Sequence, residues 1–133
     1  MEVTVRCTAA IIIACYVYFE PSVIAWAATA EATCYSMLAV GLGEDANLAG
    51  AQARAIEACV GDGGNTACCK IIGTLNGRLK GCIAAVKCDG GIGTGNGPNI
   101  DEATEQAELN ASLYADKANR NVGNCRLWSK LCK

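Results

Sequence analysis

The chain has 133 residues, with 11 Lys and Arg against 13 Asp and Glu, no His and ten Cys. This length predicts one domain with a modest core. The basic residues are scattered singly, which excludes the basic patch typical of nucleic-acid-binding proteins. The density of cysteine favours an exported protein, because disulfides persist mainly in oxidising compartments.

The first 27 residues have the pattern of a targeting segment. Arg6 precedes an uncharged apolar run at residues 7–19, and small residues at Ala25 and Ala27 form a cleavage site before Ala28. We therefore predict a signal peptide over residues 1–27.

A retained membrane anchor is the alternative for the same segment. The apolar run is shorter than the roughly 20 residues that span a bilayer. A helix that continued through Glu20 and Pro21 would place residues 7–30 in the membrane. In both cases residues 28–133 form a single cysteine-rich domain.

The remaining chain presents the same order of segments twice, which indicates an internal repeat. Each half is expected to have a strand, a glycine-rich segment, an alanine-rich segment and a second strand. The expected segments are a strand at 34–40, a turn at 41–43, a strand at 69–73, a strand at 82–86, a glycine loop or strand at 90–97, and a strand at 125–128.

The two alanine-rich segments have helical spacing. Their apolar residues fall three or four positions apart, as on one face of a helix. This spacing predicts helices near residues 47–60 and 101–115, with Asp45 or Asn47 capping the first and Asp101 the second. The expected fold is α+β, with two pseudo-symmetric ββαβ repeats that share one antiparallel sheet and are stapled by disulfides. The two apolar stripes consist of Ala51, Ala55 and Cys59, and of Ala103, Ala107, Ala111 and Tyr114.

This order of motifs resembles a bacterial family of small exported proteins, catalogued as domain of unknown function 4189. The motifs are an alanine-rich helix ending in Cys59, the segments 69–72 and 82–86, a second alanine-rich helix, and Trp128 with Cys132. The resemblance covers about residues 34–133. It implies export and no established catalysis.

Sites of enzymatic or metal chemistry are hard to build from these residues. Zinc and iron–sulfur sites use Cys pairs separated by two to four residues, or Cys with His, and this chain has neither. A Cys or Ser nucleophile usually needs a neighbouring His. We therefore expect no cofactor, no metal site and no catalytic residue. A carboxylate pair stays open as an alternative, drawn from Asp45, Asp62, Asp89 and Asp101.

Eight cysteines follow the leader, and we expect all of them to form disulfides. Cys68 and Cys69 are adjacent, so their Cα atoms lie about 3.8 Å apart, whereas disulfides prefer about 4.4–6.8 Å. On a strand they would point to opposite faces and join two different bridges. The favoured pairs are Cys59 with Cys69 and Cys82 with Cys132, and the pairing of the other four stays open. The eight are Cys34, Cys59, Cys68, Cys69, Cys82, Cys88, Cys125 and Cys132.

The expected function follows from these observations. We expect a non-enzymatic exported domain, secreted or attached to the cell envelope, that binds another protein or contributes to an envelope structure. One alternative is a small single-span subunit of a membrane complex, with its cysteine-rich domain on the oxidising side. A further alternative is an enzyme with a carboxylate site.

Overall fold

The structure is a computed structural model that describes residues 2–7, 15–20 and 27–133. Strands β1 (Glu2–Cys7) and β2 (Cys15–Glu20) pair antiparallel. Much of the predicted leader, including residues 25 and 26 of its cleavage site, lies outside the described residues. A continuous helix over residues 7–30 does not occur, because residues 15–20 and 28–30 lie in strands. Val, Tyr and Phe within residues 15–20 favour extended backbone.

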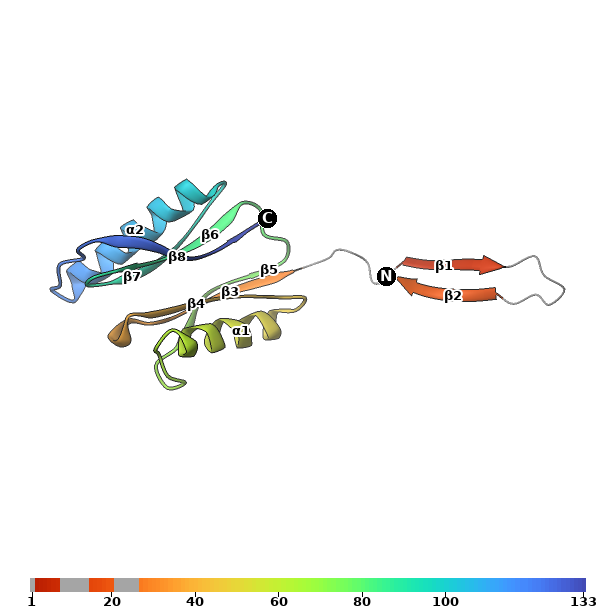
Figure 1. Ribbon diagram of the computed structural model, residues 1–133, viewed down its shortest axis with the longest axis horizontal. Helices are drawn as coiled ribbons and strands as arrows, with labels where there is room; N and C mark the ends of the chain where they lie inside the picture. The colour runs from red at the N-terminus through yellow and green to blue at the C-terminus, as the bar shows by residue number, and fades with distance from the viewer. Residues whose placement is uncertain (1, 8–14, 21–26) are drawn as a thin grey trace.

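The α+β class is confirmed, and the two halves have the same order of elements. Each half has two strands, a helix and a third strand, with the first strand in the middle of its sheet (Figure 1). The first half contains β3 (Ala28–Cys34), a short 3₁₀ turn η1 (Tyr35–Met37), β4 (Ala39–Asp45), α1 (Leu48–Gly61) and β5 (Lys70–Asn76). The second contains β6 (Cys82–Cys88), β7 (Ile92–Gly97), α2 (Ile100–Lys117) and β8 (Cys125–Cys132).

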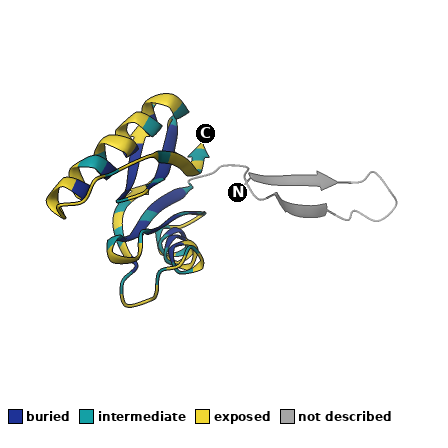
Figure 2. Ribbon diagram, turned by 60° about the vertical axis from the view of Figure 1, so that its left-hand side comes forward, coloured by how far each residue is buried: buried dark blue, intermediate teal, exposed yellow. Residues whose placement is uncertain are grey.

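The expectation of one shared sheet is wrong, because each half forms its own three-stranded antiparallel sheet. The strand orders are β4-β3-β5 and β7-β6-β8. The sheets face each other, with α1 outside the first and α2 outside the second, so the molecule has four layers (Figure 1). Val40, Ala85 and Ile92 form a small apolar cluster between the sheets. Buried residues therefore concentrate on β3, β4, β6 and β7 and on the inner sides of the helices, whereas β5 and β8 are largely exposed (Figure 2).

Glycine and alanine allow each helix to lie directly on its sheet. A Cβ at Gly43 would collide with backbone atoms of Ala51 and Ala55, and a Cβ at Gly93 would collide with those of Ala107. Gly43 lies inside β4, and Gly93 lies inside β7. The prediction of a turn at residues 41–43 is wrong, and the glycine-rich segment at 90–97 contains a strand.

Residues 34–40, predicted as a strand, contain a turn instead. Cys34 ends β3, the 3₁₀ turn follows, and Leu38 has a φ of 51° before β4 begins. The apolar side chains that suggested a strand, such as Tyr35 and Leu38, pack instead against the cluster between the sheets.

Both helices occur where alanine spacing predicts them, within one or two residues. Asn47 caps α1, because its side chain accepts a hydrogen bond of 2.8 Å from the backbone N–H of Gly50. Asn99 caps α2 in the same way through Glu102, at 2.9 Å. Asp101 is therefore not the cap and lies in the first turn, where a negative charge favours the helix dipole.

Four disulfides join the eight cysteines of residues 27–133, two within each half. The bonds are Cys34–Cys68, Cys59–Cys69, Cys82–Cys132 and Cys88–Cys125. They include both pairs that the sequence analysis favours. Within this part of the chain, no disulfide connects the first half to the second.

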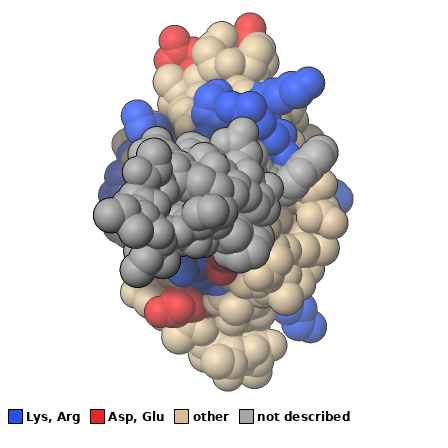
Figure 3. Space-filling view, turned by 90° about the vertical axis from the view of Figure 1, so that its right-hand side faces the viewer, with Lys and Arg blue, Asp and Glu red and all other residues tan. Residues whose placement is uncertain are grey.

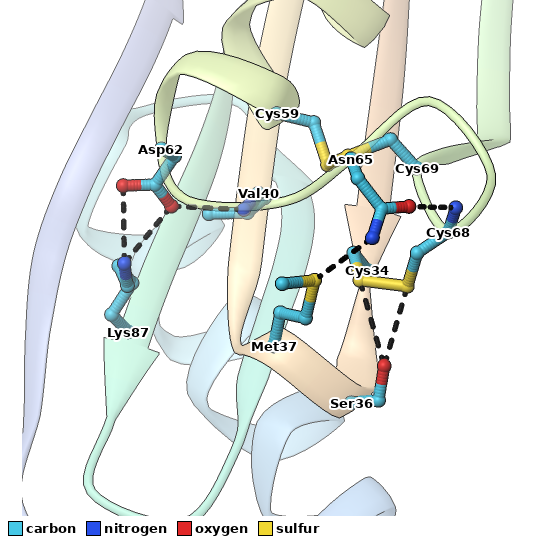
Figure 4. Close-up of a disulfide and its surroundings, with 10 residues drawn as sticks. All are labelled: Cys34, Ser36, Met37, Val40, Cys59, Asp62, Asn65, Cys68, Cys69 and Lys87. Carbon is cyan, nitrogen blue, oxygen red and sulfur yellow. Dashed lines mark hydrogen bonds and ion pairs between the residues drawn. A yellow bond between two sulfur atoms is a disulfide. The ribbon is translucent and has the colours of Figure 1, made fainter.

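The adjacent cysteines do serve two different bonds, but they lie in the turn before β5 rather than on it. Asn65 shapes that turn, since its side-chain oxygen accepts a hydrogen bond from the N–H of Cys68 at 2.8 Å (Figure 4). Both bonds contact the core cluster between α1 and its sheet. The expectation that they flank opposite faces of the sheet is therefore wrong.

Candidate binding site

Strand β3 presents a carboxylate to the space between the two sheets. Ala28, Ala30 and Ala32 belong to the core under α1, so the alternating residues Thr29 and Glu31 face the other sheet. The Glu31 carboxylate accepts a hydrogen bond of 3.3 Å from the hydroxyl of Thr94 on β7. Two sheets from different halves therefore hold this group.

Glycine on the neighbouring strand leaves room for the same carboxylate. Gly73 of β5 lies opposite Glu31 in the ladder, and a Cβ at this position would collide with the carboxylate oxygen. Residues from β3, β5 and β7 thus define the position of Glu31.

Burial changes the proton affinity of Glu31. Desolvation raises the pKa of its carboxyl above the ordinary value of 4.5, and the hydrogen bond from Thr94 acts in the opposite direction. None of the ion pairs among the described residues involves Glu31. In the described part of the structure, the charged form is therefore stabilised only by a neutral hydroxyl.

A cavity of about 160 Å³ lies beside Glu31, and we call it the Glu31 cavity. Its polar side chains are Thr29, Glu31 and Asn96, and its apolar ones are Leu75, Leu79 and Ile83. Cavities of about 150 Å³ accept a molecule as large as benzene. This space therefore fits a group of about six heavy atoms.

Two threonine hydroxyls at this layer have no hydrogen-bond partner. Thr29 is 1% exposed and Thr33 is 2% exposed, and neither Oγ1 atom has a partner in the described part of the structure. Buried hydroxyls are normally paired, because an unmade hydrogen bond costs about 1–3 kcal/mol. Thr29 lines the Glu31 cavity, so a ligand there could supply the missing partner.

An exposed apolar surface borders the entrance of this region. Tyr35, Ile72, Leu113 and Tyr114 line one hollow, and we call these four residues the Tyr35 face. The rings of Tyr35 and Tyr114 stack, with centroids 3.6 Å apart and planes 10° apart. A neighbouring hollow is lined by Tyr35 and Ile72 and also by Glu31, which connects the face to the cavity.

The four aspartates considered as a carboxylate pair occupy separate positions. Asp45 pairs with Arg54, and Asp62 pairs with Lys87 of β6 at 3.0 Å (Figure 4). Asp89 accepts a hydrogen bond from the N–H of Asn124, and Asp101 lies in the first turn of α2. Glu31 is the one carboxylate that lines the Glu31 cavity among the residues described. Within this region, the structure therefore shows no pair of converging acids.

Charge and metal-binding geometry add little to the site. On the face shown in Figure 3, several Lys and Arg side chains gather in the upper part, and Asp and Glu side chains lie at the top edge and at the lower left. The described residues contain no group of three His, Cys, Asp or Glu that could hold a metal ion. In the same part of the chain, neither helix is long and apolar enough to cross a membrane.

Sequence reasoning did not find Glu31, Tyr35 or Thr94. The available signal was the alternation of Ala with Thr and Glu at residues 28–34, which is typical of a strand with two different faces. The apolar run at residues 34–40 suggests a strand more strongly, and this alternating segment precedes it.

Comparison with known proteins gives no relative for this chain. No family model matches it, and neither a curated protein nor a solved structure matches it. The site must therefore be interpreted from its own geometry.

Proposed function

We propose that this protein is a non-enzymatic, exported, disulfide-stabilised domain that binds an extended segment of another protein. The observation that supports this proposal most is the Tyr35 face. It gathers exposed apolar residues from both halves, with Ile72 45% exposed and Leu113 52% exposed. Exposed apolar clusters of this kind, next to polar groups, are typical of interaction surfaces.

The edge of β5 suggests how such a segment would bind. In the order β4-β3-β5, one side of β5 pairs with β3, and the other side has no neighbouring strand among the described residues. An extended peptide can pair with such an edge through its backbone, while its alternate side chains enter adjacent pockets. Ile72 belongs both to β5 and to the Tyr35 face, so one segment could contact both.

Export is supported by the four disulfides, since they are stable in an oxidising compartment. We propose that residues 1–27 are removed. The mass of the protein isolated from its source then corresponds to a chain beginning at Ala28. A mass that includes residues 1–27 would favour the membrane-anchored alternative.

We also infer that the halves arose by duplication within the exported family that the chain resembles. The shared order of elements and of strands supports this inference. In an experimental structure, residues 28–76 and 82–132 are expected to superpose element by element. Different helix positions relative to the two sheets would contradict it.

A peptide-display selection on the oxidised protein tests the binding function. Selected peptides are expected to bind the wild type and to lose binding to Ile72→Asp and to Leu113→Asp. Leu109→Asp is the matched control, because Leu109 is 53% exposed on the same helix as Leu113 and does not line the hollow of the Tyr35 face.

Equal binding to all three variants would contradict the proposed surface. Failure to select any peptide would contradict the proposed class of partner. Far-UV circular dichroism of each variant verifies that the fold is retained.

A further inference from the structure

We propose that the Glu31 cavity binds one cationic group, an alkylammonium or a guanidinium, as presented by a Lys or Arg side chain of the bound segment. The source of this group rests on the proposed function. The chemistry of the cavity does not, because it depends only on the residues that line it.

The charge of Glu31 favours a cationic ligand. Glu31 is the one charged side chain that lines this cavity, and no ion pair among the described residues involves it. A partly buried carboxylate interacts more strongly with a cation than an exposed one does, because the surroundings screen the attraction less. A cationic ligand would therefore supply the charge that the protein does not.

Hydrogen bonding is the second argument. Ammonium and guanidinium groups donate hydrogen bonds and accept none. The cavity offers acceptors in Glu31, Asn96 and Thr29, and the buried Thr29 hydroxyl has no partner of its own. A ligand that only donates hydrogen bonds therefore matches the acceptors that this cavity offers.

Size and polarity are the third argument. The volume of about 160 Å³ accommodates a short alkyl chain with its charged end. Leu75, Leu79 and Ile83 form an apolar wall. Lys and Arg side chains commonly pack their methylene groups on such a surface while the charged end reaches a polar group.

The position of the cavity next to the Tyr35 face favours a side chain of the bound segment as the source of the cation. Glu31 and Asn96 line both the cavity and the hollow that contains Tyr35 and Ile72. A peptide paired with the edge of β5 projects every second side chain toward the same face. One basic side chain could therefore enter the cavity while its neighbours contact the Tyr35 face.

Small probes test the cavity without a peptide. We would titrate the oxidised protein with n-propylguanidinium and with n-butylammonium, and follow backbone amide shifts by NMR. Saturable shifts are expected at Thr29, Glu31 and Asn96. The neutral probe n-butanol, of similar size, is expected to bind at least about tenfold more weakly, as the loss of one charge-assisted hydrogen bond would produce.

Variants assign the effect to particular residues. Glu31→Gln is expected to weaken binding of both cations at least about tenfold, and Thr29→Val is expected to weaken it about threefold, as the loss of a weak neutral hydrogen bond would. Glu57→Gln is the control, because it removes the same charge from the exposed surface of α1. Equal affinity of butanol and butylammonium, or unchanged affinity in Glu31→Gln, would overturn the proposal.

The displayed peptides identify the source of the cation. Enrichment of Lys or Arg at one peptide position, lost when the selection uses Glu31→Gln, supports a side chain. Peptides that bind without a basic residue would overturn the inference and leave the binding function intact. If cations bind in a way that depends on Glu31 but no peptide is selected, the cavity still binds cations and the proposed partner is wrong.

Discussion

Thr29 places a polar side chain in a buried environment. Its hydroxyl is buried and has no hydrogen-bond partner in the described structure. Replacing an unpaired polar group with an apolar group of the same shape removes the desolvation cost without losing a bond. The unpaired hydroxyl therefore lowers the stability of the free protein, and it remains available to a ligand.

We expect Thr29→Val to increase the free energy of unfolding by about 1 kcal/mol. Urea unfolding of the oxidised protein measures this change. Thr74→Val is the control, because Thr74 is exposed on β5, and a surface substitution of this kind changes stability by at most about 0.5 kcal/mol. A less stable Thr29→Val would mean that the hydroxyl is paired in solution, for example with a buried water.

Glu31 makes stability depend on pH in the opposite sense to a salt-bridged acid. Its pKa is raised in the folded state by desolvation, so the folded protein retains the proton to higher pH than the unfolded chain does. Below the ordinary value of 4.5 the carboxyl is neutral in both states, so burial of its charge does not destabilise the folded protein. This destabilisation grows as pH rises and reaches its full size above the pKa of the folded state.

Glu31→Gln is therefore expected to be more stable than the wild type at pH 7, with a difference that shrinks toward pH 4. The amide keeps an oxygen that can accept from Thr94. Thermal unfolding between pH 4 and pH 7 measures both proteins. A constant difference across this range would show that ionisation of Glu31 is not its cause.

Close contact between helix and sheet is the main feature at the scale of elements. Gly43 contacts the backbone of α1, which cannot move aside as a flexible side chain can. Interiors that are already densely packed lose about 1–3 kcal/mol when a methyl group is forced in.

Gly43→Ala is accordingly expected to lower the free energy of unfolding by about 2 kcal/mol or more. Gly61→Ala provides a matched comparison, since a Cβ at Gly61 would meet nothing within 4 Å. Because Gly61 is the last residue of α1, alanine there is expected to be neutral or to stabilise by up to about 1 kcal/mol. Chemical denaturation of the two variants compares the effects, and equal values would show that α1 can shift away from β4.

The same packing explains how far the sequence could predict the elements. The helices were predictable, because alanines four residues apart mark a buried face whatever lies against it. Strands β3 and β4 were missed, since small residues such as Ala30 and Gly43 resemble turn or leader residues until a helix is known to cover them. The cavity was missed for a further reason. Glu31, Gly73 and Asn96 lie far apart in sequence, and only the packing of two sheets brings them together.

At the scale of the whole molecule, covalent bonds complement a core of small side chains. The fully buried residues are mostly alanine, and each contributes little apolar area. Closing a loop of about 50 residues, as Cys82–Cys132 does, contributes about 4 kcal/mol through the unfolded state. This is a large share of the roughly 5–15 kcal/mol that stabilises a typical domain.

Replacing Cys82 and Cys132 together by alanine is expected to lower the free energy of unfolding by about 4 kcal/mol. Reducing all four bonds is expected to abolish the cooperative transition. Urea unfolding with and without reductant measures both effects, and alkylation before reduction verifies that the remaining cysteines are oxidised. A reduced protein that unfolds at the same urea concentration would show that the small-residue core is sufficient.

Each of the four disulfides of residues 27–133 lies within one half, and this has a mechanical consequence. A force applied between Ala28 and Lys133 would be transmitted across the bonds Cys34–Cys68 and Cys82–Cys132. Only residues 28–34, 68–82 and 132–133 could then lengthen under load, because covalent bonds bridge the loops that contain both helices. Once these segments were extended, the protein would resist further lengthening, as a short tether with a fixed maximum length.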